Sequence, residues 1–166
     1  SDGYLLEKVR AVTVLAREPL SACTRVVSLL HSTFPHYTWS GFYLRRNVHL
    51  HLLFYRGSVL TSPDAREPME SLPGLAARSR RTQLVPDVSF DPRYERIEIP
   101  IKSEVLVPLR WRNRGVAVLD ICSGQARAFD RLDLDLLEAV AACMAPLAAA
   151  LAADPSAQTF RALGAG

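Results

Sequence analysis

Two apolar segments, residues 104–111 and 115–122, flank three polar residues and constrain the fold of this chain more than any other feature. The intervening Arg112-Asn113-Arg114 fits a tight turn, and a tight turn joins antiparallel neighbours. A second pair of aromatic and apolar segments, 38–44 and 48–55, has the same arrangement around Arg45-Arg46-Asn47. The sequence therefore predicts a sheet built mostly from hairpins.

Both ends of the chain carry apolar residues spaced three or four apart, as in a helix that buries one face. The three patterns are Leu5, Val9, Val12 and Ala16; Leu20, Cys23, Val27, Leu30 and Phe34; and Leu134, Leu137, Ala141, Met144, Ala148 and Leu151. Pro19 suits the start of the second helix, and Phe129-Asp130 opens the last one. Helices at both ends of a hairpin-connected sheet indicate an α+β fold with about five to six strands.

Two segments without periodicity, 56–72 and 86–100, contain several prolines and are predicted to be loops. A short helix over residues 74–80 and a brief strand over 83–85 are expected between them. Because ligand contacts usually come from loops held on a rigid sheet, these two loops are the expected place for a binding site.

The length of 166 residues and the apolar share of 49% suit one globular domain. We expect an N-terminal helix within residues 1–19, serving as a linker or dimerisation segment, then one domain over 20–153 and a loose tail over 154–166. No uninterrupted run of about 18 apolar residues is present, since Pro146 breaks the alanine-rich tract 139–153. The sequence therefore predicts no membrane span.

The basic charge of the chain is almost entirely arginine, because only Lys8 and Lys102 among the 20 basic residues are lysine. The densest runs are Arg78, Arg80 and Arg81, followed by Arg110, Arg112 and Arg114. A net charge of +3 spread along the chain makes no continuous basic stripe. Nucleic-acid binding is therefore not expected of this domain.

Three widely spaced cysteines, Cys23, Cys122 and Cys143, form no CxxC pair. This spacing argues against a disulfide framework and a structural zinc site, and it favours a cytoplasmic location. His49 and His51 share one face of a predicted strand, but spacing supplies no third ligand. We expect these histidines to line a solvated face, and we expect no metal site.

Four segments, in this order, resemble the GAF domain, a small-molecule-sensing module. They are Val-Pro-Asp-Val-Ser-Phe-Asp-Pro-Arg-Tyr at 85–94, Val-Leu-Val-Pro-Leu at 105–109, Gly-Val-Ala-Val-Leu-Asp at 115–120, and Phe129-Asp130 leading into Leu137-Glu138. The likeness covers roughly residues 20–151. It implies a central antiparallel sheet flanked by N- and C-terminal helices, in a cytoplasmic sensory or regulatory domain.

Narrower signals resemble the GAF branch that contains the free methionine-(R)-sulfoxide reductases: Trp-Ser-Gly-Phe-Tyr at 39–43, Thr-Gln-Leu-Val-Pro-Asp-Val at 82–88, and Ser103-Glu104. The positions of that branch's redox cysteines fall on Pro73 and Ile97 here. Neither side chain can attack a sulfoxide sulfur or form a disulfide, so the resemblance implies that the activity is absent. The alternative is a divergent reductase that uses an unexpected cysteine.

The reductase branch binds its ligand in a cage with an aromatic floor and several carboxylates. Trp39, Tyr43, Glu104 and Asp120 match positions of that cage, and Cys122 replaces its remaining acid. The resemblance thus implies capture of a cation by Glu104 and Asp120, helped by a cation–π contact with Trp39. In the alternative interpretation Trp39 and Tyr43 are ordinary core residues, Glu104 faces solvent and Asp120 pairs with an arginine.

No cofactor is expected. Cyclic-nucleotide-binding GAF domains carry Asn-Lys where this chain has Ser123-Gly124, so a cyclic nucleotide is not expected. The positions of the cysteines and histidines favour neither bilin attachment nor haem. The leading hypothesis is a non-catalytic sensory or regulatory domain of a signalling or transcriptional protein, with an unidentified small-molecule ligand. The third alternative is a structural dimerisation module with a closed pocket. We also expect a homodimer through the apolar stripes of the terminal helices, unless these helices cover each other within one subunit.

Overall fold

The computed structural model describes residues 2–57, 66–94, 100–156 and 161–162. Its helices are α1 (Asp2–Val14), α2 (Pro19–Thr33), α3 (Leu72–Ser79) and α4 (Arg131–Ala153), with 3₁₀ turns η1 (Val88–Phe90) and η2 (Pro92–Tyr94). Its strands are β1 (Trp39–Arg46), β2 (His49–Gly57), β3 (Arg66–Pro68), β4 (Gln83–Val85), β5 (Ser103–Trp111), β6 (Arg114–Ser123) and β7 (Arg161–Ala162).

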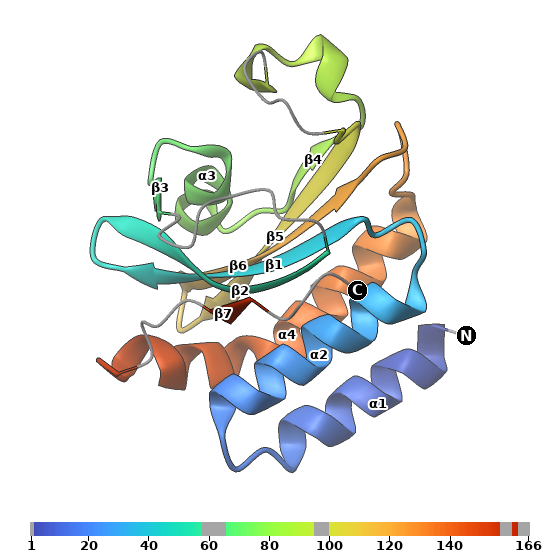
Figure 1. The fold of residues 1–166 in the computed structure, drawn as a ribbon. Helices are drawn as coiled ribbons and strands as arrows, with labels where there is room; N and C mark the ends of the chain where they lie inside the picture. Colours follow the sequence, from blue (N-terminus) through green and yellow to red (C-terminus); the bar gives the residue numbers. More distant parts are fainter. Residues whose placement is uncertain (1, 58–65, 95–99, 157–160, 163–166) are drawn as a thin grey trace.

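The strands form one sheet in the order β3-β2-β1-β6-β5-β4, in which all neighbours are antiparallel, and β7 pairs with β2 in parallel. Helices α1, α2 and α4 cover one face, whereas α3 lies on the other (Figure 1). The predicted α+β fold, with its hairpins β1–β2 and β5–β6, is therefore confirmed. Arg112 and Asn113 both have positive φ, at 49° and 63°, as a two-residue hairpin turn requires.

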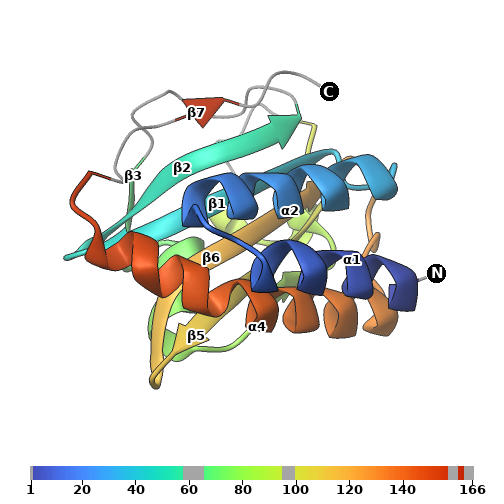
Figure 2. The same cartoon turned by 90° about the horizontal axis from the view of Figure 1, so that it is seen from below.

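The helix face of the sheet holds the larger core. Leu137, Met144 and Ala148 of α4 are completely buried there, while Leu5 and Val9 of α1 pack into the same cluster. Figure 2 shows α1 alongside both α2 and α4. The apolar stripes of the terminal helices are thus covered within one subunit, and the expected homodimer remains a prediction.

Helix α4 is long and apolar enough to cross a membrane by length and composition alone. It nevertheless packs along β5 and β6 as a core helix, and its buried residues face the sheet. Asp130 caps its start, since the Asp130 carboxylate accepts from the Asp133 amide and the Asp133 carboxylate accepts from the Asp130 amide. The Arg46 guanidinium donates to the carbonyls of Leu151 and Ala152 at the other end.

The structure differs from the expected elements at two places. Part of the segment predicted as a loop, Arg66–Pro68, pairs with the start of β2 as strand β3. Part of the tail predicted to be loose, Arg161–Ala162, pairs with the end of β2 as β7. Neither β3 nor β7 shows a periodic apolar pattern, so only the neighbouring strand reveals them.

Candidate functional site

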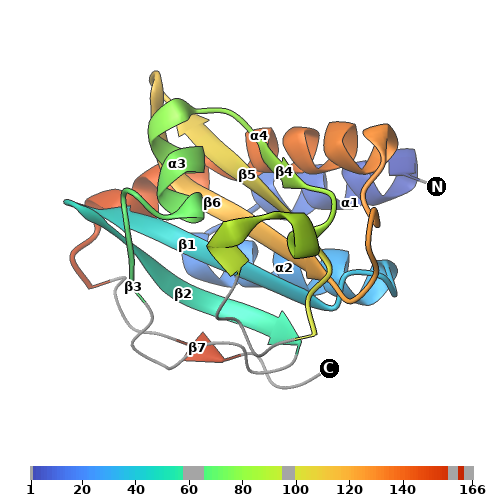
Figure 3. The same ribbon diagram turned by 90° about the horizontal axis from the view of Figure 1, so that it is seen from above.

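A cavity of about 430 Å³ opens on the sheet face opposite the three long helices. Residues of β1, β5 and β6 form its floor, and residues of α3 and η2 also line it. Figure 3 looks onto this face of the sheet, on which α3 lies. Its lining comprises Trp39, Tyr43, Glu67, Glu70, Ser71, Leu72, Pro73, Arg93, Tyr94, Ile101, Glu104, Asp120 and Cys122. The two long segments that border it are those in which the sequence places the loops.

Strand alternation and register bring the floor residues together. Side chains two apart on a strand share a face, so Trp39 and Tyr43 of β1 point into the cavity, as do Asp120 and Cys122 of β6. Cys122 lies directly opposite Trp39 on one side and directly opposite Glu104 of β5 on the other. Three neighbouring strands thus contribute one row of aromatic, thiol and carboxylate groups.

The aromatic part of the floor is closely packed. The Trp39 ring stacks on Tyr55 with centroids 5.9 Å apart and lies across the backbone of Gly41. The Trp39 side chain is buried, and its indole N–H has no hydrogen-bond partner among the described residues. A buried donor without a partner is costly, so this N–H is available to a ligand acceptor or a bound water.

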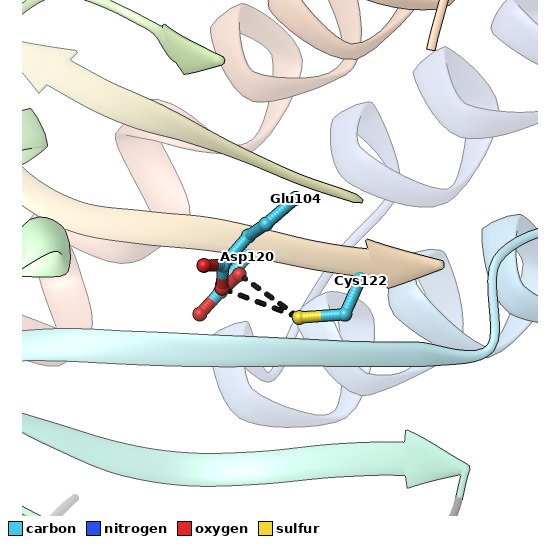
Figure 4. Close-up of side chains that lie close together, drawn as sticks. All are labelled: Glu104, Asp120 and Cys122. Atoms are coloured by element: carbon cyan, nitrogen blue, oxygen red, sulfur yellow. Dashed lines mark hydrogen bonds between the residues drawn. The ribbon is translucent and has the colours of Figure 1, made fainter. Parts of the chain in front are cut away.

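Glu104, Asp120 and Cys122 form a buried cluster on this floor (Figure 4). The Cys122 Sγ lies 3.2 Å from Glu104 Oε2 and 3.7 Å from Asp120 Oδ1. Glu104 is 8% exposed and Asp120 is 3% exposed. The Tyr94 hydroxyl donates a hydrogen bond to the other oxygen of Glu104, so the phenol of η2 closes over the cluster.

Burial and the neighbouring negative charge favour the protonated forms of Asp120 and Cys122. Desolvation raises the pKa of Asp120 well above its ordinary value, and the Glu104 carboxylate raises it further. The same two causes raise the pKa of the Cys122 thiol and of the Tyr94 hydroxyl. A nearby positive charge would lower the pKa values of Asp120 and Cys122, so these groups titrate more readily beside a cation.

The rim of the cavity adds to this negative character. Glu67 and Glu70 line the wall, and burial raises the pKa of Glu67. Arg93 is the only basic residue among the described lining residues, and its Nε lies 2.9 Å from Asp91 Oδ1. Because Asp91 already pairs with this guanidinium, most of the acidic charge in the cavity has no basic partner.

The donor atoms of the cluster could also hold a metal ion. The ligand atoms of Glu104, Asp120 and Cys122 lie within 4.8 Å of one another, and one thiolate with two carboxylates suits a divalent ion such as Zn²⁺. His49 and His51 lie on β2 outside the cavity lining, with ring centroids 6.3 Å apart. Within the described part of the chain they belong to no group of three potential metal ligands.

All five residues proposed from the sequence as ligand contacts line this one cavity: Trp39, Tyr43, Glu104, Asp120 and Cys122. The alternative interpretation fails for the two acids, since Glu104 is buried and Asp120 forms no ion pair with an arginine among the described residues. Pro73, at one of the positions matched to a redox cysteine, is buried and lines the cavity. Ile97, at the other, lies outside the described residues.

Sequence reasoning missed five polar lining residues, Glu67, Glu70, Ser71, Arg93 and Tyr94. Arg93 and Tyr94 fall within the segment 85–94 that carries the family likeness, but the sequence of that segment does not indicate that their side chains face a cavity. Glu67 and Glu70 lie in a stretch without periodicity. Only the pairing of β3 with β2 brings this stretch beside the cavity.

Comparisons with known proteins identify the family of this fold. The GAF domain family model matches residues 21–147. Among curated proteins, Protein YtsP of Bacillus subtilis is 25% identical over 133 residues, which cover 78% of this chain and 79% of that protein. Protein ZMO0507 of Zymomonas mobilis is 29% identical over 121 residues, which cover 71% of this chain and 73% of that protein.

Solved structures of similar shape include the type II free methionine-R-sulfoxide reductase of Thermoplasma acidophilum, with 26% identity, a TM-score of 0.72, and coverage of 88% of this chain and 95% of that chain. The free methionine-R-sulfoxide reductase of Neisseria meningitidis, solved with its substrate, has 25% identity and a TM-score of 0.78, and the match covers 88% of this chain and 87% of that chain. The GAF domain of an Acinetobacter phosphoenolpyruvate-protein phosphotransferase, at 18% identity and a TM-score of 0.74 over 88% and 91%, shares the fold. The family match spans most of the sequence, and this chain belongs to the GAF domain family.

Proposed function

We propose that this GAF domain is a non-catalytic regulatory module that binds a small cationic or amino-acid-like molecule in the cavity over β1, β5 and β6. The cation would lie against Glu104 and Asp120, with the Trp39 ring as the aromatic wall. The observation that supports this proposal most directly is the buried cluster in which Cys122 Sγ lies 3.2 Å from Glu104 Oε2 and 3.7 Å from Asp120 Oδ1. Binding there would replace protons by the ligand's positive charge.

A cytoplasmic signalling or transcriptional protein is the setting we propose, because GAF domains commonly bind small molecules and the cavity is open enough to admit one. Its volume of about 430 Å³ lies within the range of about 300–1,000 Å³ that ligand pockets occupy. A structural module with a closed pocket is therefore the weaker proposal.

A divergent methionine sulfoxide reductase is the second candidate, favoured by the likeness to two reductases and by a thiol at the cavity floor. Reduction of a sulfoxide needs a thiolate nucleophile and then a second thiol that resolves the oxidised sulfur. Burial beside two carboxylates raises the pKa of Cys122 and disfavours its thiolate. Cys23 belongs to the core on the other sheet face and Cys143 lies on α4, so neither lines the cavity.

Thermal unfolding with added ligands tests the binding proposal. Choline, spermidine and free methionine sulfoxide serve as probes, and a probe at a hundred times its Kd should raise the Tm by roughly 5–10 °C. Asp120→Asn keeps the shape of the floor but removes the carboxylate with which a bound cation would pair, so it should abolish the shift. Asp135→Asn, on the exposed face of α4, is the matched control and should leave the shift unchanged.

Mass spectrometry of the denatured protein provides the second arm, because a co-purified small molecule would identify the ligand directly. Incubation with free methionine-R-sulfoxide and a thioredoxin system provides the third. We expect no methionine above the blank. Methionine production that disappears in Cys122→Ser would overturn the non-catalytic assignment and support the reductase.

A further inference from the structure

The two arginine runs of the sequence meet at one end of the sheet, away from the cavity. Arg80 ends α3 with a positive φ of 60°, and its Nη1 donates to the Asn113 carbonyl over 3.0 Å. Gly115 allows this approach, because a Cβ there would stand 2.2 Å from the Ala77 carbonyl oxygen. Figure 3 shows α3 beside the tip of the β5–β6 hairpin. The fold thus gathers into one region six arginines from two runs that are about 30 residues apart in sequence: Arg78, Arg80, Arg81, Arg110, Arg112 and Arg114.

These six arginines, all exposed, have no carboxylate partner in the described part of the chain, where the ion pairs are His36–Asp133, Arg93–Asp91 and Arg131–Asp135. Their interactions are with neutral groups instead. Arg78 donates to the Met69 carbonyl, and the Arg112 guanidinium lies 5.7 Å from the centre of the Trp111 ring. An exposed group of cations without counter-charges attracts an anionic partner.

A groove of about 550 Å³ runs from this arginine cluster to α4. Arg80, Arg81 and Arg110 border it, and its one acidic residue, Glu138, accepts a hydrogen bond from Thr82. The remaining lining is mostly apolar: Leu84, Val107, Pro108, Trp111, Leu134, Ala142, Ala145 and Pro146. We call this surface the arginine groove.

Two large side chains in the arginine groove remain exposed although they are apolar. Leu84 is 41% exposed and Trp111 is 37% exposed. Pro146 on α4 has no N–H to donate to the carbonyl of Ala142 one turn earlier. Aromatic and arginine side chains around an apolar depression are the residues that most often anchor protein partners.

We propose that the arginine groove binds an acidic, amphipathic protein segment whose apolar side chains contact Leu84 and Trp111. The acidic residues of this partner segment would pair with Arg80, Arg81 and Arg110, which have no carboxylate partner among the described residues. Nucleic acid is the less suitable occupant, because Glu138 and an apolar floor interrupt the basic track that a phosphate backbone requires. This inference concerns a different surface from the ligand cavity and does not depend on the proposed function.

Fluorescence anisotropy with three labelled probes tests the proposal: a peptide that alternates glutamate with leucine, polyglutamate, and a short DNA duplex. The full chain should bind the alternating peptide more tightly than either other probe, and added salt should weaken binding. The double variant Arg81→Glu/Arg110→Glu should weaken it at least about tenfold. Trp111→Ala should weaken it about three- to tenfold, because it removes an apolar anchor and leaves the charge unchanged.

The matched control is Arg10→Glu/Arg25→Glu, which makes the same charge change at exposed positions on α1 and α2. Equal losses in the two double variants, tighter binding of the duplex, or no effect of Trp111→Ala would each overturn the proposal. Tryptophan fluorescence gives an independent readout, since Trp39 is 2% exposed and Trp111 is 37% exposed. Peptide addition should change the emission of the native chain and leave that of Trp111→Phe unchanged.

Discussion

The indole of Trp39 lies across Gly41 so closely that a Cβ at position 41 would stand 2.2 Å from the ring. Both residues are on β1 and share the cavity face, two positions apart. Only glycine leaves enough room at position 41, because the Trp39 ring is rigid and is held in place by its stacking on Tyr55. The aromatic floor of the cavity therefore depends on the absence of one side chain.

Gly41→Ala should destabilise the protein by about 1–3 kcal/mol, because the new methyl group forces the Trp39 ring out of its position. Ligand binding should weaken as well, since the ring forms the cavity wall. Urea unfolding measures the stability. Gly124→Ala is the control, because its nearest neighbour atoms lie at 3.4 Å and 3.6 Å and the methyl group fits. Equal stability of Gly41→Ala and native protein would show that the ring does not occupy this place.

The buried Asp120 predicts how stability depends on pH. Burial and the Glu104 charge raise its pKa in the folded state, so the folded protein binds a proton that the unfolded chain releases above about pH 4. The stabilising contribution of this proton is complete below the unfolded pKa and is lost as the pH rises through the folded pKa. Asp120→Asn should therefore flatten the decline of unfolding free energy above about pH 4. Urea unfolding at a series of pH values measures this dependence. An unfolding free energy that falls equally steeply with pH in both proteins would contradict the prediction.

Thiol reactivity separates the three cysteines. Burial raises the pKa of Cys23 to about 12, and burial beside Glu104 and Asp120 raises the pKa of Cys122, whereas Cys143 is partly exposed on α4. Because only thiolates alkylate rapidly, iodoacetamide at neutral pH should label Cys143 first in the folded protein. Peptide mass spectrometry measures the order, and labelling in urea confirms that all three react when unfolded. Rapid labelling of Cys122 in the folded protein would indicate a reactive thiolate and favour the reductase.

The fold could be predicted from local signals, because hairpins and amphipathic helices each bury their apolar faces in a way that sequence spacing records. Pro19 starts α2, and strand β4 covers the expected residues, Gln83–Val85. The convergence of Trp39, Glu104 and Cys122 could be proposed only through the family likeness, because the register that aligns β1, β6 and β5 is a long-range property. Spacing within each strand carries no information about that register.

The unpredicted parts of the site have a common physical origin. Glu67 and Tyr94 reach the cavity through short elements, β3 and η2, which are set by pairing with other segments and by local proline and aspartate turns. The meeting of the two arginine runs likewise depends on the packing of α3 against the β5–β6 hairpin. In a single sequence such runs are typical of solvated surface charge.

Self-association through the terminal helices remains a prediction, but the buried stripe residues leave it to other side chains of α1. Val9 is completely buried within the subunit, whereas Val14 and Leu15 at the end of α1 are 80% and 78% exposed. We expect a homodimer that Val14→Glu/Leu15→Glu converts to monomer, as measured by sedimentation over a range of concentrations. Val9→Glu should instead unfold the chain, because it buries a charge. A native protein that sediments as an 18.4 kDa monomer at every concentration would exclude the dimer.

The start of α4 provides a last prediction, because Asp133 makes three contacts there, one of them with His36 Nε2 at 3.3 Å. Its carboxylate accepts a hydrogen bond from the Asp130 amide and, over 3.0 Å, one from the hydroxyl of Tyr37, whose side chain is 1% exposed. Asp133→Ala would remove half of the capping box and leave a buried hydroxyl without a partner. The expected cost is about 2–4 kcal/mol.

Asp135→Ala is the matched control for this variant, because Asp135 lies two residues further along the same helix in an exposed pair with Arg131, 3.2 Å away. Such a pair contributes about 0.3–0.5 kcal/mol. Tyr37→Phe in the Asp133→Ala background should recover part of the loss, since it removes the hydroxyl that has lost its acceptor. Urea unfolding of the three variants measures these differences. If Tyr37→Phe brings no recovery, the cost of Asp133→Ala comes from the helix cap and the lost His36 contact.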